Sequence, residues 1–170
     1  MNRPRYRIPA PARRAHIDTF RKAQLRATRL TEAEISEIMS VIRQCAARLR
    51  EGVATELQVE LLRSTMLIAH QIEHLGYLRG MSGHIEAAML ALSTVHDRAS
   101  STGAWTPVQL HLQEMDAINC MVDLHDHQLR QLSFAELQQA TNRVIAQMRS
   151  QGGGSVVQVD PADLELGVFP

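Results

Sequence analysis

Aromatic side chains are scarce in this chain, and the shortage limits what its core and its surface can be. Only six of the 170 residues are Phe, Trp or Tyr, scattered from Tyr6 to Phe169. A core must therefore be built from Leu, Ile, Val, Met and Ala, of which Leu, Met and Ala favour helix. So few aromatics also argue against a surface that stacks the bases of single-stranded nucleic acid.

Cysteines and long apolar runs are also lacking. Cys45 and Cys120 are the two cysteines, and each falls inside a predicted helix, so no disulfide framework is expected. No run of 18 apolar residues occurs, so we expect no membrane-spanning helix. The basic N-terminal residues are not followed by an apolar segment of the secretory type. The expected compartment is the reducing cytoplasm.

Lysine is almost absent. Of the 18 basic residues, 17 are arginine and only Lys22 is lysine. Because lysine codons are AT-rich, this bias suggests a GC-rich bacterial genome. It also weakens any inference that arginine was selected here for bidentate phosphate contacts.

The net charge of zero hides a strong asymmetry. Residues 1–30 carry nine basic residues and a single acid, Asp18, whereas the remaining residues carry nine basic residues and seventeen acids. Such a basic arm can bind phosphates, bind an acidic protein, or fold back on its own acidic body. The candidate partner-binding residues are Arg3, Arg5, Arg7, Arg13, Arg14, Arg21 and Lys22.

The sequence favours a protein over nucleic acid as the partner of the arm. Contact with nucleic acid through residues 1–29 would be mainly electrostatic and sensitive to salt. However, no helix-turn-helix signature is evident, and the acidic body would repel DNA beyond the arm. A protein partner is therefore slightly favoured.

Three parts follow from the composition. Residues 1–30 form a basic arm, in which 16–29 could be a short helix; residues 31–151 form a helical bundle; residues 152–170 form a Gly linker and a tail. The tail carries Val156, Val157 and Val159, which could dock on the body or a twin subunit, or add a strand to a partner.

Apolar spacing and capping pairs predict an all-α fold, an antiparallel four-helix-type bundle with an additional C-terminal helix. The helices are expected at about 32–51, 55–78, 82–101, 106–132 and 133–150. Capping boxes mark four starts, at Thr31, Thr55, Thr106 and Ser133. At the fourth helix Pro107 adds a typical first helical residue. Long heptad-like stripes favour self-association, most simply as a homodimer.

A histidine pair is the one candidate metal site. His70 and His74 lie one turn apart with Glu73 between them, which matches the H-x-x-E-H zinc motif of inverzincin peptidases. That resemblance covers five residues only, and the third ligand has no clear candidate beyond Glu86 or Glu114. A Zn²⁺ site at His70 and His74 is therefore kept as an alternative to two solvated histidines.

Other chemical side chains are expected to be structural. His96, His111 and His125 fall on apolar stripes, but Glu-x-x-His pairs of the ferritin-like kind are missing. A second stripe, on the predicted helix 106–132, places acidic residues around a cysteine. Acidic neighbours raise the pKa of a thiol and so disfavour a nucleophilic thiolate. The stripe consists of Asp116, Cys120, Asp123 and His127. The sequence thus favours a non-enzymatic interaction or regulatory protein, with a metal-binding bundle as the alternative.

Overall fold

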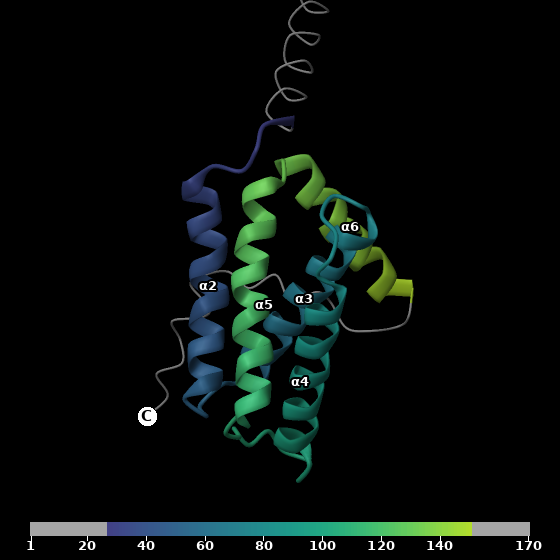
Figure 1. Cartoon of the computed structure of the whole chain (residues 1–170). Coiled ribbons are helices and arrows are strands. Elements are labelled where there is room, and N and C mark those ends of the chain that lie inside the picture. Colours follow the sequence, from purple (N-terminus) through teal and green to yellow (C-terminus); the bar gives the residue numbers. More distant parts are fainter. Residues whose placement is uncertain (1–26, 151–170) are drawn as a thin grey trace, which may run out of the picture.

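The computed structural model of the chain describes residues 27–150, which are predominantly helical (Figure 1). The helices are α2 (Glu32–Arg50), α3 (Glu56–His74), α4 (Ser82–Ser100), α5 (Leu112–Gln131) and α6 (Phe134–Ser150). Within this range no strand forms, and Arg29 and Ser133 make an isolated antiparallel bridge. The all-α prediction is confirmed. None of these helices has the length and apolarity that crossing a membrane requires.

Three of the four predicted capping boxes are formed. The Thr31 hydroxyl accepts from the Glu34 N–H, and the Glu34 carboxylate accepts from the Thr31 N–H at 2.7 Å. Thr55 and Gln58 make the same reciprocal pair at the start of α3. Ser133 and Glu136 make it at the start of α6. These pairs satisfy amides that a helix start leaves without a partner.

Helix α3 ends four residues before the predicted position, at His74 rather than Leu78. Gly76 adopts φ +79°, a left-handed conformation that favours glycine. Its N–H donates to the Glu73 carbonyl, and the Tyr77 N–H donates to the Ile72 carbonyl at 3.3 Å. These two bonds form a Schellman motif, which closes the helix and turns the chain.

The predicted start of the fourth helix at Thr106 is wrong, because α5 begins at Leu112. The intervening residues are held by contacts with other parts of the chain. The Thr106 N–H donates to the Ala99 carbonyl at 2.8 Å, and the Trp105 indole N–H donates to the Ala54 carbonyl at 3.0 Å. The capping carboxylate of α5 is Glu114, which accepts from the His111 N–H at 2.8 Å.

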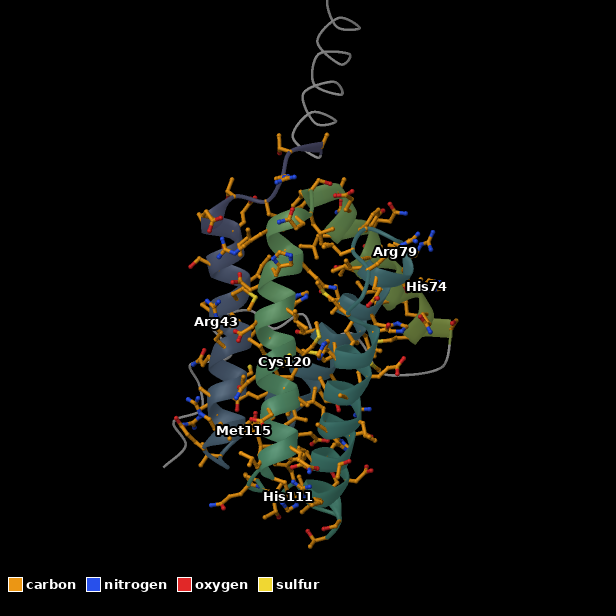
Figure 2. All side chains as sticks on the ribbon, in the orientation of Figure 1. Arg43, His74, Arg79, His111, Met115 and Cys120 are labelled. Carbon is orange, nitrogen blue, oxygen red and sulfur yellow. The ribbon has the colours of Figure 1, made fainter. Side chains whose placement is uncertain are left out.

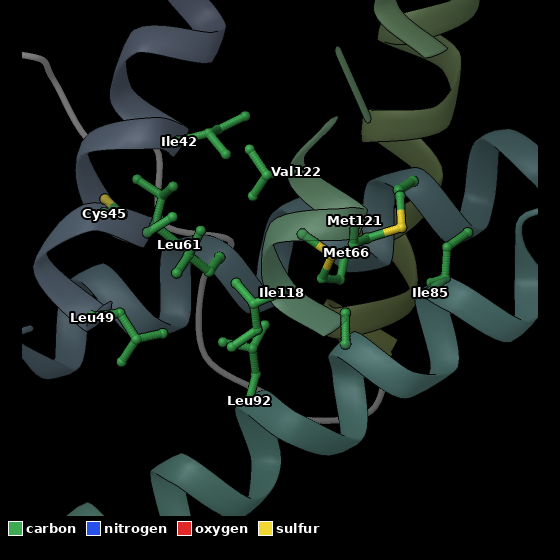
Figure 3. Packing of buried hydrophobic residues seen from close by; sticks show 14 of the residues in the cluster. Ile42, Cys45, Leu49, Leu61, Met66, Ile85, Leu92, Ile118, Met121 and Val122 are labelled. Atoms are coloured by element: carbon green, nitrogen blue, oxygen red, sulfur yellow. The ribbon is translucent and has the colours of Figure 1, made fainter. Parts of the chain in front are cut away.

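Four helices enclose the main hydrophobic core. Helix α2 packs against α3 and α5, and α4 likewise packs against α3 and α5, so the contacts close a ring (Figure 1). Leu49, Leu92 and Ile118 come from three of these helices and lie together in the interior (Figure 3). Methionines also contribute to this core, where an unbranched thioether can fit irregular gaps. Those buried are Met39, Met66, Met81 and Met121.

Helix α6 lies outside this ring and packs on α3. A second apolar cluster joins them, with Ile72, Leu132 and Ala140 buried at its centre. The Tyr77 hydroxyl also donates to the Gln139 side-chain carbonyl at 2.8 Å, which ties the turn after α3 to α6. Of the α6 side chains, only Ala140 and Val144 are fully buried. This helix is therefore less embedded than the other four.

Candidate interaction surfaces

The seven predicted arm residues, Arg3 to Lys22, lie outside the described residues, but the base of the arm is fixed. The Leu30 N–H donates to the Leu132 carbonyl at 3.1 Å, and the Phe134 N–H donates to the Thr28 carbonyl at 3.2 Å. Leu30 itself is buried in the main core. Residues 28–30 are therefore attached to the turn between α5 and α6, and residues 1–27 precede this anchored point.

Carboxylates near the base of the arm already have partners. Glu34 and Glu136 are held by the capping bonds of α2 and α6, and hydrogen bonds from Thr31 lower the pKa of Glu34. Glu32 accepts from the Arg130 guanidinium at 2.6 Å. Three of the acids that could draw the arm back onto this end of the body are thus engaged in local contacts.

The histidine pair of the candidate zinc site lies on the surface of α3. His70 and His74 are both exposed, and Figure 2 shows His74 near α6. One oxygen of the Glu73 carboxylate, Oε1, accepts from the Gly80 N–H at 2.8 Å and the Met81 N–H at 3.1 Å, whereas Oε2 is buried without a hydrogen-bond partner among the described residues. Residues 27–150 bring no three His, Cys, Asp or Glu side chains together as a metal-binding group. Zinc binding there stays a prediction.

His125 is deeply buried in the bundle. Its Nδ1 lies 3.0 Å from the Gln128 Oε1, and the Gln128 Nε2 donates to the Ala69 carbonyl on α3. Burial lowers the pKa of His125, although Gln128 and Asp126 act in the opposite direction. Because the Gln128 oxygen accepts, Nδ1 carries the proton of the neutral imidazole. This chain of bonds links α5 to α3 and serves structure.

The two other histidines of the apolar stripes have different positions. His96 is half-buried beside Trp105, with ring centroids 5.8 Å apart, and its Nε2 lies 3.7 Å from a Glu60 oxygen. His111 is exposed and stands directly before α5 (Figure 2).

The cysteine stripe of α5 lies on the surface. Asp116, Cys120, Asp123 and His127 are all exposed. Cys120 Sγ lies 3.7 Å from the Nδ1 of His84 on α4, a contact that the sequence spacing did not indicate. The second cysteine, Cys45, is buried, and burial raises the pKa of its thiol to about 11.

An open groove of about 530 Å³ runs between α2 and α5. One wall is basic and apolar, with Arg43 and Arg50 flanking the small side chains of Ala46 and Ala47. Figure 2 shows Arg43 on α2 beside α5. The other wall consists of Asn119, Val122 and Asp123. We call this feature the α2–α5 groove.

The two arginines of the α2–α5 groove differ in their partners. The Arg43 guanidinium lies 3.2 Å from Asp126, which also pairs with Arg130 at 3.4 Å. Arg50 has no ion-pair partner within residues 27–150. The groove therefore has a basic character on a body that is acidic as a whole, since residues 31–150 hold nine basic residues and fourteen acids.

Sequence patterns alone did not reveal the α2–α5 groove, because it depends on which two helices become neighbours. The local signal in the sequence is an arginine pair seven residues apart with two alanines between them. In comparisons with known proteins, no family model, curated protein or solved structure matches this chain.

Proposed function

We propose that this chain is a non-enzymatic interaction or regulatory protein. Its basic N-terminal arm binds an acidic macromolecular partner, and a protein partner is favoured over nucleic acid. The observation that carries the proposal is the anchored base of the arm. Two backbone hydrogen bonds attach residues 28 and 30 to the α5–α6 turn. Nine basic residues against one acid in residues 1–30 supply the electrostatic attraction.

The helical body is the support from which the arm would act. We infer an antiparallel four-helix bundle from the closed ring of helix contacts, with α6 as an addition on α3. Among the acids near the arm base, Glu32 is paired with Arg130, which weakens its attraction for the arm, whereas Glu34 and Glu136 accept capping hydrogen bonds and keep their charge. A bacterial cytoplasm is the setting we expect.

A protein partner is preferred because the body is acidic. DNA carries a dense, extended charge that would meet residues 31–150, where acids outnumber basic residues. An acidic protein can present its charge to the arm alone. The same seven side chains, Arg3 to Lys22, would make the contacts in either case.

Binding by the full chain tests this proposal. The probes are fluorescent polyglutamate and a DNA duplex of similar total charge, compared at the same ionic strength. The test variant replaces all seven candidate residues with glutamine. The control is Arg143→Gln with Arg149→Gln, which removes two exposed positive charges from α6.

The proposal expects that wild type and control bind polyglutamate, that both bind the duplex less tightly, and that the arm variant loses polyglutamate binding. Equal binding by the arm variant would refute the arm as the contact. Tighter binding to the duplex would replace the protein partner with nucleic acid.

We also propose that the chain forms a homodimer. Leu90, in the middle of α4, is 70% exposed, the largest exposed fraction among the large apolar side chains of the described residues. Sedimentation equilibrium of wild type and Leu90→Gln tests this. A dimer weakened by the substitution supports the proposal, and a wild-type monomer contradicts it.

A further inference from the structure

Two metal-binding side chains from different helices meet on the surface of the bundle. Cys120 lies midway along α5 (Figure 2), and its Sγ is 3.7 Å from the Nδ1 of His84 in the first turn of α4. Both residues are exposed, so a dissolved ion reaches the two atoms without any opening of the core. Because α4 and α5 pack against each other, the two helices hold these side chains in fixed relative positions.

The distance between the sulfur and the nitrogen suits two ligands of one zinc ion. Zinc binds a thiolate at about 2.3 Å and an imidazole nitrogen at about 2.0–2.1 Å, with tetrahedral angles. Two such bonds place the sulfur and the nitrogen about 3.6 Å apart. The observed separation of 3.7 Å agrees with this value. An ion on the solvent side of the contact therefore requires little movement of either helix.

The charges around Cys120 also suit a cation. Asp116 and Asp123 lie one turn away from it on either side in the cysteine stripe, and neither makes an ion pair within residues 27–150. The single arginines of α4 and α5, Arg98 and Arg130, are both paired with carboxylates. The arginines of α2 line the α2–α5 groove, to which Cys120 does not contribute. The charges that flank the thiol along α5 are therefore negative, which favours a bound cation.

We propose that Cys120 and His84 form a surface zinc site that links α5 to α4. The thiol binds as the thiolate and releases its proton to solvent, while the imidazole binds through an unprotonated Nδ1 and keeps its proton on Nε2. The part of the chain that the structure describes places no third His, Cys, Asp or Glu side chain with this pair. Water therefore completes the four-coordinate ion, and the positions that water fills stay open to exchange.

This pair differs from His70 and His74, the candidate zinc ligands of the sequence. Those two histidines lie on a single helix and offer nitrogen alone. Cys120 adds a thiolate, a ligand typical of structural zinc sites. The donor atoms make the two pairs distinguishable by spectroscopy. Co²⁺ bound to a thiolate absorbs light by charge transfer from sulfur to metal, whereas Co²⁺ bound to imidazole alone does not.

Titration of the full, reduced chain with Co²⁺ and then with Zn²⁺ tests the proposal. We expect one Co²⁺ per chain with the thiolate charge-transfer band, and loss of the band when Zn²⁺ displaces Co²⁺. Cys120→Ser should abolish the band. His84→Gln should weaken zinc binding by at least about tenfold, because even partners outside the ligand set contribute that much in known sites.

Two control variants remove the same kinds of side chain elsewhere. Cys45→Ala deletes the buried thiol, His70→Gln with His74→Gln deletes two exposed imidazoles, and both should retain the band. Melting curves of every variant confirm that each is folded. As a second readout, Zn²⁺ should slow the alkylation of Cys120 by iodoacetamide in wild type but not in His84→Gln.

Three results would overturn the proposal. The first is a wild type without the thiolate band, or with an affinity for zinc that His84→Gln leaves unchanged. The second is a loss of zinc binding confined to the variant of His70 and His74, which would move the metal to α3. The third is one ion per two chains, which would show that a second copy, rather than water, completes the coordination.

Discussion

Within residues 27–150, one buried histidine couples the stability of this protein to pH. His125 is 2% exposed, and its pKa is lowered by burial, so the folded chain holds the neutral imidazole. The unfolded chain binds a proton at the ordinary histidine pKa of about 6.5. Because the unfolded state then binds more protons, acidification favours unfolding.

We therefore predict that the free energy of unfolding falls as pH decreases below about 6.5, by at most about 1.4 kcal/mol per pH unit for this one group. Urea titrations between pH 7.5 and 5.5 measure the slope. His125→Asn keeps an N–H near Gln128 and should lower stability overall but flatten the slope. An unchanged slope in this variant would show that another group is responsible.

The two cysteines should differ sharply in reactivity. Cys120 is exposed beside His84, whereas Cys45 is buried in the core and has a thiol pKa raised to about 11. Because the thiolate is the reactive form, alkylation of the folded chain should modify Cys120 alone. Mass spectrometry of peptides after iodoacetamide treatment checks this. Equal labelling of both sites without denaturant would contradict the packing of α2.

At the level of elements, the helix starts show what local sequence can and cannot predict. The pairs at Thr31, Thr55 and Ser133 were correctly predicted, because a capping box needs only residues three apart. Thr106 and Pro107 carry the same pattern, but contacts with distant residues such as Ala54 hold this segment outside a helix. Such contacts have no signature in a local window.

The candidate interaction surfaces also differ in whether local sequence predicts them. The basic arm was found from charge alone, although its residues lie outside the described range. The α2–α5 groove could not be predicted, because Arg43 and Asn119 become neighbours only after α2 and α5 pair. The early end of α3 is only partly predictable from the sequence. Gly76 is present in the sequence, but the predicted range runs to residue 78, and the two Schellman bonds end the helix at His74.

The difference between Thr55, which caps a helix, and Thr106, which does not, can be measured as a loss of stability. Thr55→Ala removes a side-chain cap and should cost about 0.5–2 kcal/mol of unfolding free energy. Thr106→Ala removes no helix cap, so we expect a clearly smaller loss. Chemical denaturation of the two variants provides the comparison. Equal losses would indicate that Thr106 does begin a helix in solution.

At the scale of the whole molecule, charge is separated along the chain. Residues 1–30 are basic, and the body and tail are acidic. The arm is joined to the body at the α5–α6 turn, and the acidic residues 151–170 follow α6 in the sequence.

The salt dependence of polyglutamate binding by the full chain shows whether the basic arm makes the contact with an acidic partner. If several arm residues bind acidic groups, the logarithm of affinity falls steeply with the logarithm of salt concentration, because each contact releases counterions. We predict a clearly shallower slope and weaker binding when Arg3 to Lys22 are neutralised, and no change for the Arg143 and Arg149 control. Superimposable curves for wild type and the arm variant would show that the arm does not bind the acidic partner.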